Sequence, residues 1–322
     1  MLGSHTEQGK GTAKVISTTS STHARSRGVI YIAIGRRFYD EACISARSLR
    51  RYMPTIPIAL FTDQSVGADD LFETVTRIEQ SGMRPHRVKL VWMPRSSFDE
   101  TLYLDTDTYV CGEVAELFDL LDAFDIAMTH DRGYVDNFPP EENVPDAFRE
   151  LNTGVVVYHN SPRVTEMFAD SLACFDRFSD TEFANLNDQQ PLRMAIYRSE
   201  VRIAPLTFEY NCRFPNFGYL SGRVKILHGR PPLSCYSEQT LQEIADRLNE
   251  VTIPRVFVAG KIFGLAKNAG RFARPYYASH IGNLFRSRWV YLIDRALANS
   301  KEEGTGRGVG RILQRLKAQR RG

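Results

Sequence analysis

The sequence predicts an α/β protein with a mixed, mostly parallel sheet flanked by helices, because strand-like and helix-like segments alternate along the first two thirds of the chain. A strand, a helix and a second strand open this pattern, and two carboxylates stand directly after a later apolar strand. The chain has 322 residues, 43% of them hydrophobic, which suffices for one sizeable core and a smaller appendage.

The first strand, helix and strand occupy residues 29–61. The run VIYIAI at 29–34 is apolar and β-branched, and after Gly35 the apolar residues Ala42, Ala46 and Leu49 follow at helical spacing. Two prolines end this helix, and the run IPIALF predicts the second strand. Such a unit favours parallel pairing with a right-handed crossover. We expect a short helix near residues 69–72 and a strand near 74–78 to continue the alternation.

The segment TLYLDTDTYV is the most informative in the chain, because a strand at 101–104 runs directly into Asp105 and Asp107. Ligands of open α/β sheets bind outside the carboxyl ends of strands. Two carboxylates at spacing two point to the same side of an extended chain, and hard divalent cations prefer oxygen ligands. The segment therefore predicts a site for Mn²⁺ or Mg²⁺, with a solvated surface pair as the alternative.

Further elements follow the two carboxylates. FDIAMTHD predicts a strand, and residues 155–158 predict another, entered through Asn152-Thr153-Gly154. Helices are expected over residues 164–178, 192–197 and 237–249. The loop at 133–149 is expected to border an acceptor, since substrate pockets are commonly built from such variable loops.

Over about residues 29–230, and in order, the sequence resembles the family 8, glycogenin-like glycosyltransferases. LDTDTYV resembles the family's metal motif, NTGVVVY the strand that lines the donor sugar, NDQQPL the D-Q motif, and LTFEYN with ILHG the closing segment. The resemblance implies the GT-A fold, a Rossmann-like arrangement. It also implies metal-dependent transfer of a sugar from a nucleotide diphosphate, a UDP-sugar, to a hydroxyl acceptor with retention of configuration.

The resemblance also implies roles for individual residues. Asp105, Asp107 and His228 would be metal ligands. Asp188 is the catalytic candidate, either stabilising an oxocarbenium-like transition state or forming a covalent intermediate. Donor contacts are implied for Ile34, Gly35, Tyr39, Lys89, Thr106, Asn152, Thr153, Gly154, Gln189 and Arg230, the last in place of a lysine of the family.

Each of these assignments has a purely structural alternative. Asn152 and Gly154 can serve a turn before a strand, and Asp188 and Gln189 can cap a helix. His228 can be a hydrogen-bonded structural histidine.

A phosphatase of the haloacid dehalogenase superfamily is the alternative function. The order of an apolar strand followed by Asp105, Thr106, Asp107 and Thr108 fits its D-x-D-x-T loop, with Asp105 as nucleophile and Asp107 as general acid. Two predicted strands precede this loop, however, where the phosphatase loop normally follows the first strand. No G-D-x-x-x-D segment comes after it.

The chain is expected to divide into a disordered leader (1–27), a transferase domain (28–235), a basic helical extension (236–303) and a Gly-rich linker with a basic amphipathic tail (304–322). Residues 255–322 hold 15 Lys or Arg and three acids, so they carry a formal charge of +12 against −9 for the rest. This basic C-terminal segment, which includes the tail, favours contact with an anionic membrane over contact with nucleic acid.

No stretch of the sequence has the roughly 18–20 uninterrupted apolar residues of a membrane-spanning helix, and its first residues lack the apolar run of a signal peptide. The expected location is the cytoplasm, with peripheral contact to the inner face of the membrane through the basic C-terminus. A homodimer is a further expectation. The acceptor, whether saccharide, lipid or small molecule, is not legible from the sequence.

Overall fold

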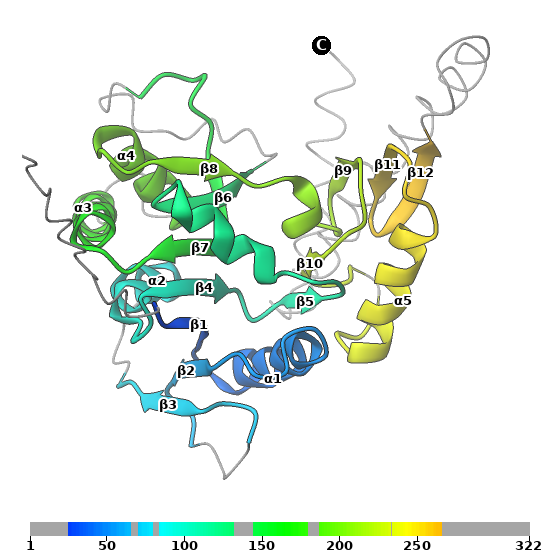
Figure 1. Cartoon of the computed structure of the whole chain (residues 1–322), viewed down its shortest axis with the longest axis horizontal. Coiled ribbons are helices and arrows are strands. Elements are labelled where there is room, and N and C mark those ends of the chain that lie inside the picture. The colour runs from blue at the N-terminus through cyan, green and yellow to red at the C-terminus, as the bar shows by residue number, and fades with distance from the viewer. Residues whose placement is uncertain are drawn as a thin grey trace, which may run out of the picture.

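A seven-stranded sheet forms the centre of the molecule (Figure 1). The structure is a computed structural model, and it describes residues 25–65, 70–79, 84–131, 144–179, 187–232 and 234–265. The strand order is β3-β2-β1-β4-β7-β6-β8. Every neighbouring pair is parallel except the two pairs formed by β7, which runs against β4 and β6. The predicted mixed, mostly parallel sheet is confirmed. The strands are β1 (Arg27–Ala33), β2 (Ile58–Thr62), β3 (Thr74–Arg77), β4 (Glu100–Leu104), β6 (Ile126–His130), β7 (Leu151–His159) and β8 (Ile203–Pro205).

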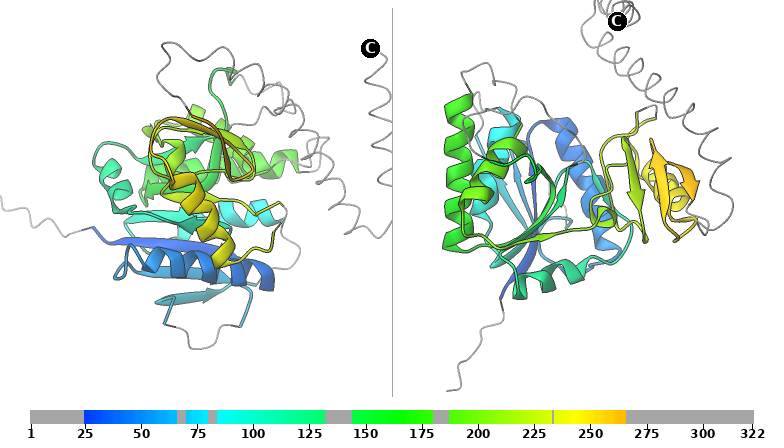
Figure 2. Two further views of the ribbon diagram at one scale, coloured as in Figure 1. Left: turned by 90° about the vertical axis from the view of Figure 1, so that its right-hand side faces the viewer. Right: turned by 90° about the horizontal axis from the view of Figure 1, so that it is seen from above.

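Helices cover both faces of this sheet, as the right-hand view of Figure 2 shows. One face packs against α1 (Arg36–Arg50) and the 3-10 helix η2 (Ala115–Asp122). The other packs against α2 (Pro85–Trp92), α3 (Pro162–Phe178) and α4 (Gln189–Arg198). Burial on both faces explains why the first strand is an unbroken apolar run: alternate residues of β1 enter the two different clusters.

A smaller unit with its own apolar cluster adjoins the carboxyl ends of the strands. It holds a two-stranded sheet, a three-stranded sheet of order β12-β11-β9 and the helix α5, which starts at the Ser237 cap. Its elements are β5 (Thr108–Val110), η4 (Phe208–Tyr210), β9 (Phe217–Leu220), β10 (Ile226–His228), α5 (Glu238–Asn249), β11 (Arg255–Val258) and β12 (Lys261–Leu265).

The predicted helical extension needs a correction. Its first helix is confirmed as α5, but residues 255–265 form the hairpin β11–β12. Both turn residues, Ala259 and Gly260, have positive φ (47° and 71°), which matches the twist of a two-residue hairpin. The remainder of the extension and the basic tail lie outside the described residues.

Two smaller predictions are also corrected. Asp70 and Leu71 form a turn, so the described part of the helix expected near residues 69–72 is not helical, while residue 69 lies outside the described part. The sheet begins at Arg27, one residue inside the expected leader. Residues 1–24 lie outside the described part, as do residues 133–143 of the loop expected to border the acceptor. No helix among the described residues is long and apolar enough to cross a membrane.

Candidate metal centre

Asp105 and Asp107 lie in the tight turn that joins β4 to β5. The carbonyl oxygen of Asp105 accepts hydrogen bonds from the backbone N–H (3.1 Å) and the hydroxyl (2.7 Å) of Thr108. The Asp105 N–H in turn donates to the carbonyl of Gly154 on β7 (2.8 Å). These bonds fix the turn against the sheet, so the two carboxylates lie together at the carboxyl end of β4, as the sequence predicts.

His228 reaches the same point from a distant part of the chain. β10 pairs antiparallel with β5, which places His228 opposite Thr108. Its Nε2 lies 3.5 Å from a carboxylate oxygen of Asp105 and 3.5 Å from one of Asp107. One ligand atom from each of the three residues falls within 4.8 Å of the others, the one such group found among the described residues.

The ring of His228 is held in a defined orientation. Asn211 donates through Nδ2 to Asn152 Oδ1 (2.8 Å), so its own Oδ1 is the acceptor that faces His228 Nδ1 at 2.8 Å. Nδ1 therefore carries a proton and Nε2 faces the carboxylates. A hydrogen bond of this kind on the second ring nitrogen is the usual support for a metal-binding imidazole.

Gly154 is required by the close approach of this ring. A Cβ at position 154 would lie 2.0 Å from His228 Cε1, so no other residue fits. Asn152, Thr153 and Gly154 lie within β7 and do not form a turn before it, contrary to the structural alternative.

Lys89, on α2, lies between two acidic residues of the site. Its Nζ is 2.9 Å from Asp105 Oδ1 and 3.0 Å from Asp188 Oδ2, and it donates to the hydroxyl of Thr153 (3.0 Å). Burial opposes ionisation of both carboxyls, but the Lys89 ammonium holds the pKa of Asp105 and of Asp188 well below the usual range. His228 and His86 add to this effect on Asp105 and Asp188 respectively.

Arg230 flanks the other carboxylate. It lies 3.0 Å from Asp107 Oδ2 and forms a two-bond pair with Glu41 of α1 (2.8 and 2.6 Å). Glu41 is buried and also accepts from the Thr106 hydroxyl at 3.2 Å. Asp105 and Asp107 therefore lie between two cations, Lys89 from α2 and Arg230 from the segment after β10.

The three ligands suit a hard or borderline dication. Burial lowers the pKa of His228, but Asp107 and Asp105 outweigh it and raise the pKa above its ordinary value. The carboxylates thus attract positive charge onto the imidazole. Two carboxylates and one imidazole form a donor set that Mn²⁺ accepts readily and that also provides oxygen ligands for Mg²⁺. The residues present therefore fit the predicted metal.

Asp188 and Gln189 face the site from the start of α4. Asp188 stands at the N-cap position of α4, but its side chain makes no capping hydrogen bond. Its Oδ1 is instead 2.8 Å from His86 Nδ1. The amide of Gln189 accepts from Asn152 Nδ2 (2.8 Å) and donates to Glu150 (3.2 Å). The predicted residues Asp188, Gln189 and Asn152 are therefore joined to the metal ligands through Lys89 and Asn211.

The residues predicted at the end of β1 lie apart from this network. Gly35 has φ of 89° and donates its N–H to Asp63 at 2.8 Å, which closes the turn into α1. Tyr39 is half-buried against the core cluster that contains α1. The neighbouring Phe38 is 37% exposed, and its ring centroid lies 5.5 Å from the Arg230 guanidinium.

Sequence reasoning missed three residues that shape the site: Glu41, His86 and Asn211. Asn211 lies within LTFEYN, so the motif itself gave a signal that could have identified it. Glu41 and His86 carry no comparable signal, since each looks like an ordinary polar residue of a helix surface.

No known protein family model matches the chain, and no curated protein matches it. Among solved structures, the chain is similar to the glycosyltransferase GlyE of Streptococcus pneumoniae TIGR4, with 17% identity, a TM-score of 0.47, and coverage of 70% of this chain and 63% of GlyE. It is similar to the galactosyltransferase LgtC in complex with donor and acceptor sugar analogs, with 12% identity, a TM-score of 0.46, and coverage of 70% and 97%.

The bifunctional glycosyltransferase WbbM matches with 14% identity, a TM-score of 0.45, and coverage of 61% of this chain and 41% of WbbM. The chain thus spans less than two thirds of GlyE and of WbbM. Because all three TM-scores lie below 0.5, the function of this chain has to be inferred from the residues of its own site.

Proposed function

We propose that the protein is a metal-dependent glycosyltransferase of the GT-A type, which moves a sugar from a UDP-sugar to a hydroxyl acceptor with retention of configuration. One observation carries the proposal: Asp105, Asp107 and His228 converge with a cation on either side, Lys89 and Arg230. The resemblance of the sequence to family 8 glycosyltransferases involves the same residues and supports this reading.

The charges of the site suit a diphosphate leaving group. Departure of a nucleoside diphosphate leaves negative charge on the phosphate that was bonded to the sugar. A bound Mn²⁺ or Mg²⁺ would neutralise part of that charge as a Lewis acid. Lys89 and Arg230 supply further positive charge from side chains that are already held in place by carboxylates, so little reorganisation is needed when the donor binds.

The reaction that fits this site breaks the bond from the sugar C1 to the phosphate oxygen and forms a bond from C1 to the acceptor oxygen. The proton of the acceptor hydroxyl passes to the departing phosphate. Asp188 is buried and held ionised beside Lys89 and His86, so it can supply negative charge to an oxocarbenium-like transition state but has no proton to donate.

The phosphatase alternative gains no support from the site. Tyr103 donates to Asp105 Oδ1 at 2.6 Å and Lys89 pairs with the same carboxylate, so Asp105 is held by several partners and is poorly suited to act as a nucleophile. Among the described residues, the third side chain that joins Asp105 and Asp107 is the imidazole of His228. The magnesium site of that superfamily calls for further carboxylates instead.

The test is hydrolysis of a panel of nucleotide sugars, measured as release of the nucleoside diphosphate with Mn²⁺ and with a chelator. We expect one donor to be hydrolysed slowly only with metal, and Asp107→Asn to abolish this. Asp119→Asn is the matched control, since this carboxylate is 67% exposed on η2. Absence of hydrolysis and of binding for every donor, together with Mg²⁺-dependent release of phosphate from phosphomonoesters, would contradict the proposal.

A further inference from the structure

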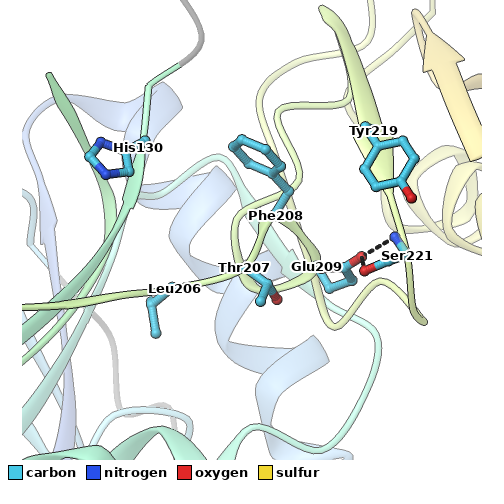
Figure 3. Close-up of a pocket in the computed structure, with 7 residues that line it drawn as sticks. All are labelled: His130, Leu206, Thr207, Phe208, Glu209, Tyr219 and Ser221. Atoms are coloured by element: carbon cyan, nitrogen blue, oxygen red, sulfur yellow. Dashed lines mark hydrogen bonds between the residues drawn. The ribbon is translucent and has the colours of Figure 1, made fainter. Parts of the chain in front are cut away.

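A pocket of about 320 Å³ lies where the large sheet meets the small unit. Three segments line it: His130 at the end of β6, the stretch from Leu206 to Glu209, and Tyr219 with Ser221 around β9 (Figure 3). Small-molecule sites occur preferentially at such junctions, and a volume near the lower end of the usual range suits one sugar ring better than a long chain.

The walls of the pocket combine aromatic rings with hydroxyl and imidazole groups. Figure 3 shows Phe208 between His130 and Tyr219. Tyr219 is 48% exposed, because its strand buries the alternate residues Gly218 and Leu220. A pyranose has one face of C–H groups, which stacks on an aromatic ring, and a rim of hydroxyls, which need hydrogen-bond partners. Tyr219 and Phe208 offer the rings, and the side chains of Thr207 and His130 offer the polar partners.

The pocket is formed in advance of any ligand. The buried carboxylate of Glu209 accepts from the N–H of Ser221 (2.6 Å) and of Gly222 (2.9 Å) and from the Ser221 hydroxyl (3.3 Å). These bonds tie η4 to the end of β9, which fixes Phe208 relative to Tyr219. Because one Glu209 oxygen accepts all three hydrogen bonds, we assign this carboxylate a structural role, which is to hold the pocket wall in place.

Two of the three lining segments, the one that contains η4 and the end of β6, continue into residues that support the metal ligand His228. η4 is followed by Asn211, which contacts His228, and His130 is followed by Asp131, whose carboxylate accepts from Asn152 at 3.0 Å. Asn211 and Asn152 are themselves hydrogen-bonded. A ligand in the pocket therefore lies on the flank of the proposed donor site.

We propose that this pocket binds a sugar unit of a saccharide acceptor, with Tyr219 as its stacking residue. The inference rests on the proposed function and specifies the acceptor as a saccharide. A saccharide is favoured over a lipid, because sugar hydroxyls can pair with the side chains of His130 and Thr207, whereas an acyl chain would cover these polar groups without pairing with them.

The test is saturation-transfer-difference NMR on the whole protein, without donor or metal. The probes are methyl glycosides of glucose, galactose, mannose and N-acetylglucosamine, their common disaccharides, and a short-chain fatty acid. We expect at least one saccharide to bind. Tyr219→Ala should weaken binding at least tenfold, whereas Tyr219→Phe should keep it within about twofold because the ring remains. Tyr197→Ala is the matched control, since Tyr197 is 44% exposed on α4 and packs against Phe148.

Metal-dependent donor hydrolysis by the same variants separates this inference from the proposed function. We expect the wild type, Tyr219→Ala, Tyr219→Phe and Tyr197→Ala to hydrolyse the donor at the same rate. Saccharide binding that depends on Tyr219, in a wild type that neither hydrolyses nor binds any donor and that releases phosphate from phosphomonoesters with Mg²⁺, would support the pocket and contradict the transferase. Absence of saccharide binding, binding that Tyr219→Ala leaves unchanged, or binding of the fatty acid alone would overturn the pocket assignment.

Discussion

The carboxyl ends of β4 and β1 are neighbours in one sheet, yet they differ in how firmly their side chains are held. At β4, Asp105 and Asp107 contact Lys89, His228 and Arg230, and each contact is supported by a further hydrogen bond or ion pair. At β1, Gly35 contacts Asp63, and the adjacent Phe38 is exposed. The difference indicates that the diphosphate end of the proposed donor site is preorganised. The β1 end, where the family resemblance implies that Tyr39 packs on the nucleotide base, is an open surface.

The largest expected effect comes from the β4 end. Asp105→Asn removes a charge that the proposed metal needs, so metal-dependent donor hydrolysis should fall by roughly 10²–10³-fold, as for other groups that stabilise transition-state charge. Asp63→Asn, at the end of β2 beside Gly35, is the matched change and should cost no more than a few-fold. Equal effects of the two variants on the hydrolysis rate would break the comparison.

Lys89→Ala should destabilise the fold. It leaves the buried Asp188 and the partly buried Asp105 without their shared cation, and breaking a buried ion pair from one side costs about 3–5 kcal/mol of unfolding free energy. Chemical denaturation of the variant and the wild type measures this loss. Mn²⁺ should restore more stability to the variant than to the wild type, because the metal replaces part of the missing positive charge. A loss below about 1 kcal/mol, or no such difference, would show that Lys89 is dispensable for the charge balance.

His86→Ala tests a positioning residue at the same end. His86 contacts Asp188 at 2.8 Å, so its loss should lower kcat about tenfold while the KM for donor stays within twofold. This is less than the roughly 10²–10⁴-fold that a group transferring a proton itself contributes. His86→Asn keeps a donor near the Nδ1 position and should recover most of the rate. A rise in KM with unchanged kcat, or no rescue by Asn, would contradict this role.

The smallest effects are expected at the β1 end. Phe38→Ala and Tyr39→Ala should each raise the KM for donor by about two- to tenfold with little change in kcat, since stacking on a base contributes about 1 kcal/mol or slightly more. Phe38 should matter at least as much as Tyr39, because its ring is exposed beside Arg230 while Tyr39 packs against the core. Competition binding of UDP to the two variants measures the difference.

The sequence predicted the elements that depend on local pattern. β1, α1 and β2 follow from one apolar run, one helical spacing and two prolines, and Asp105 and Asp107 follow directly from their strand. His228 could be placed only through the family resemblance, because its position depends on β10 pairing with β5, more than a hundred residues away.

Other features depend on contacts that no local pattern encodes. Glu41 meets Arg230 across 189 positions, and His86 meets Asp188 across 102. The small size required at Gly154 is set by the His228 ring and not by backbone conformation. The β11–β12 hairpin was missed because its Ala259-Gly260 turn lacks the usual Asn-Gly signal and its flanks are basic and aromatic. Contact of the C-terminal tail with an anionic membrane and the homodimer stay predictions.

The central claim is that Asp105, Asp107 and His228 hold a metal that receives the donor diphosphate. Its most direct test is the affinity for Mn²⁺, measured by electron paramagnetic resonance with and without UDP, in the wild type and in His228→Ala. The account predicts that UDP and Mn²⁺ tighten each other's binding by the same factor, as linkage requires, and that His228→Ala weakens Mn²⁺ binding at least tenfold. Mn²⁺ binding that is absent, or that neither UDP nor His228→Ala changes, would contradict it.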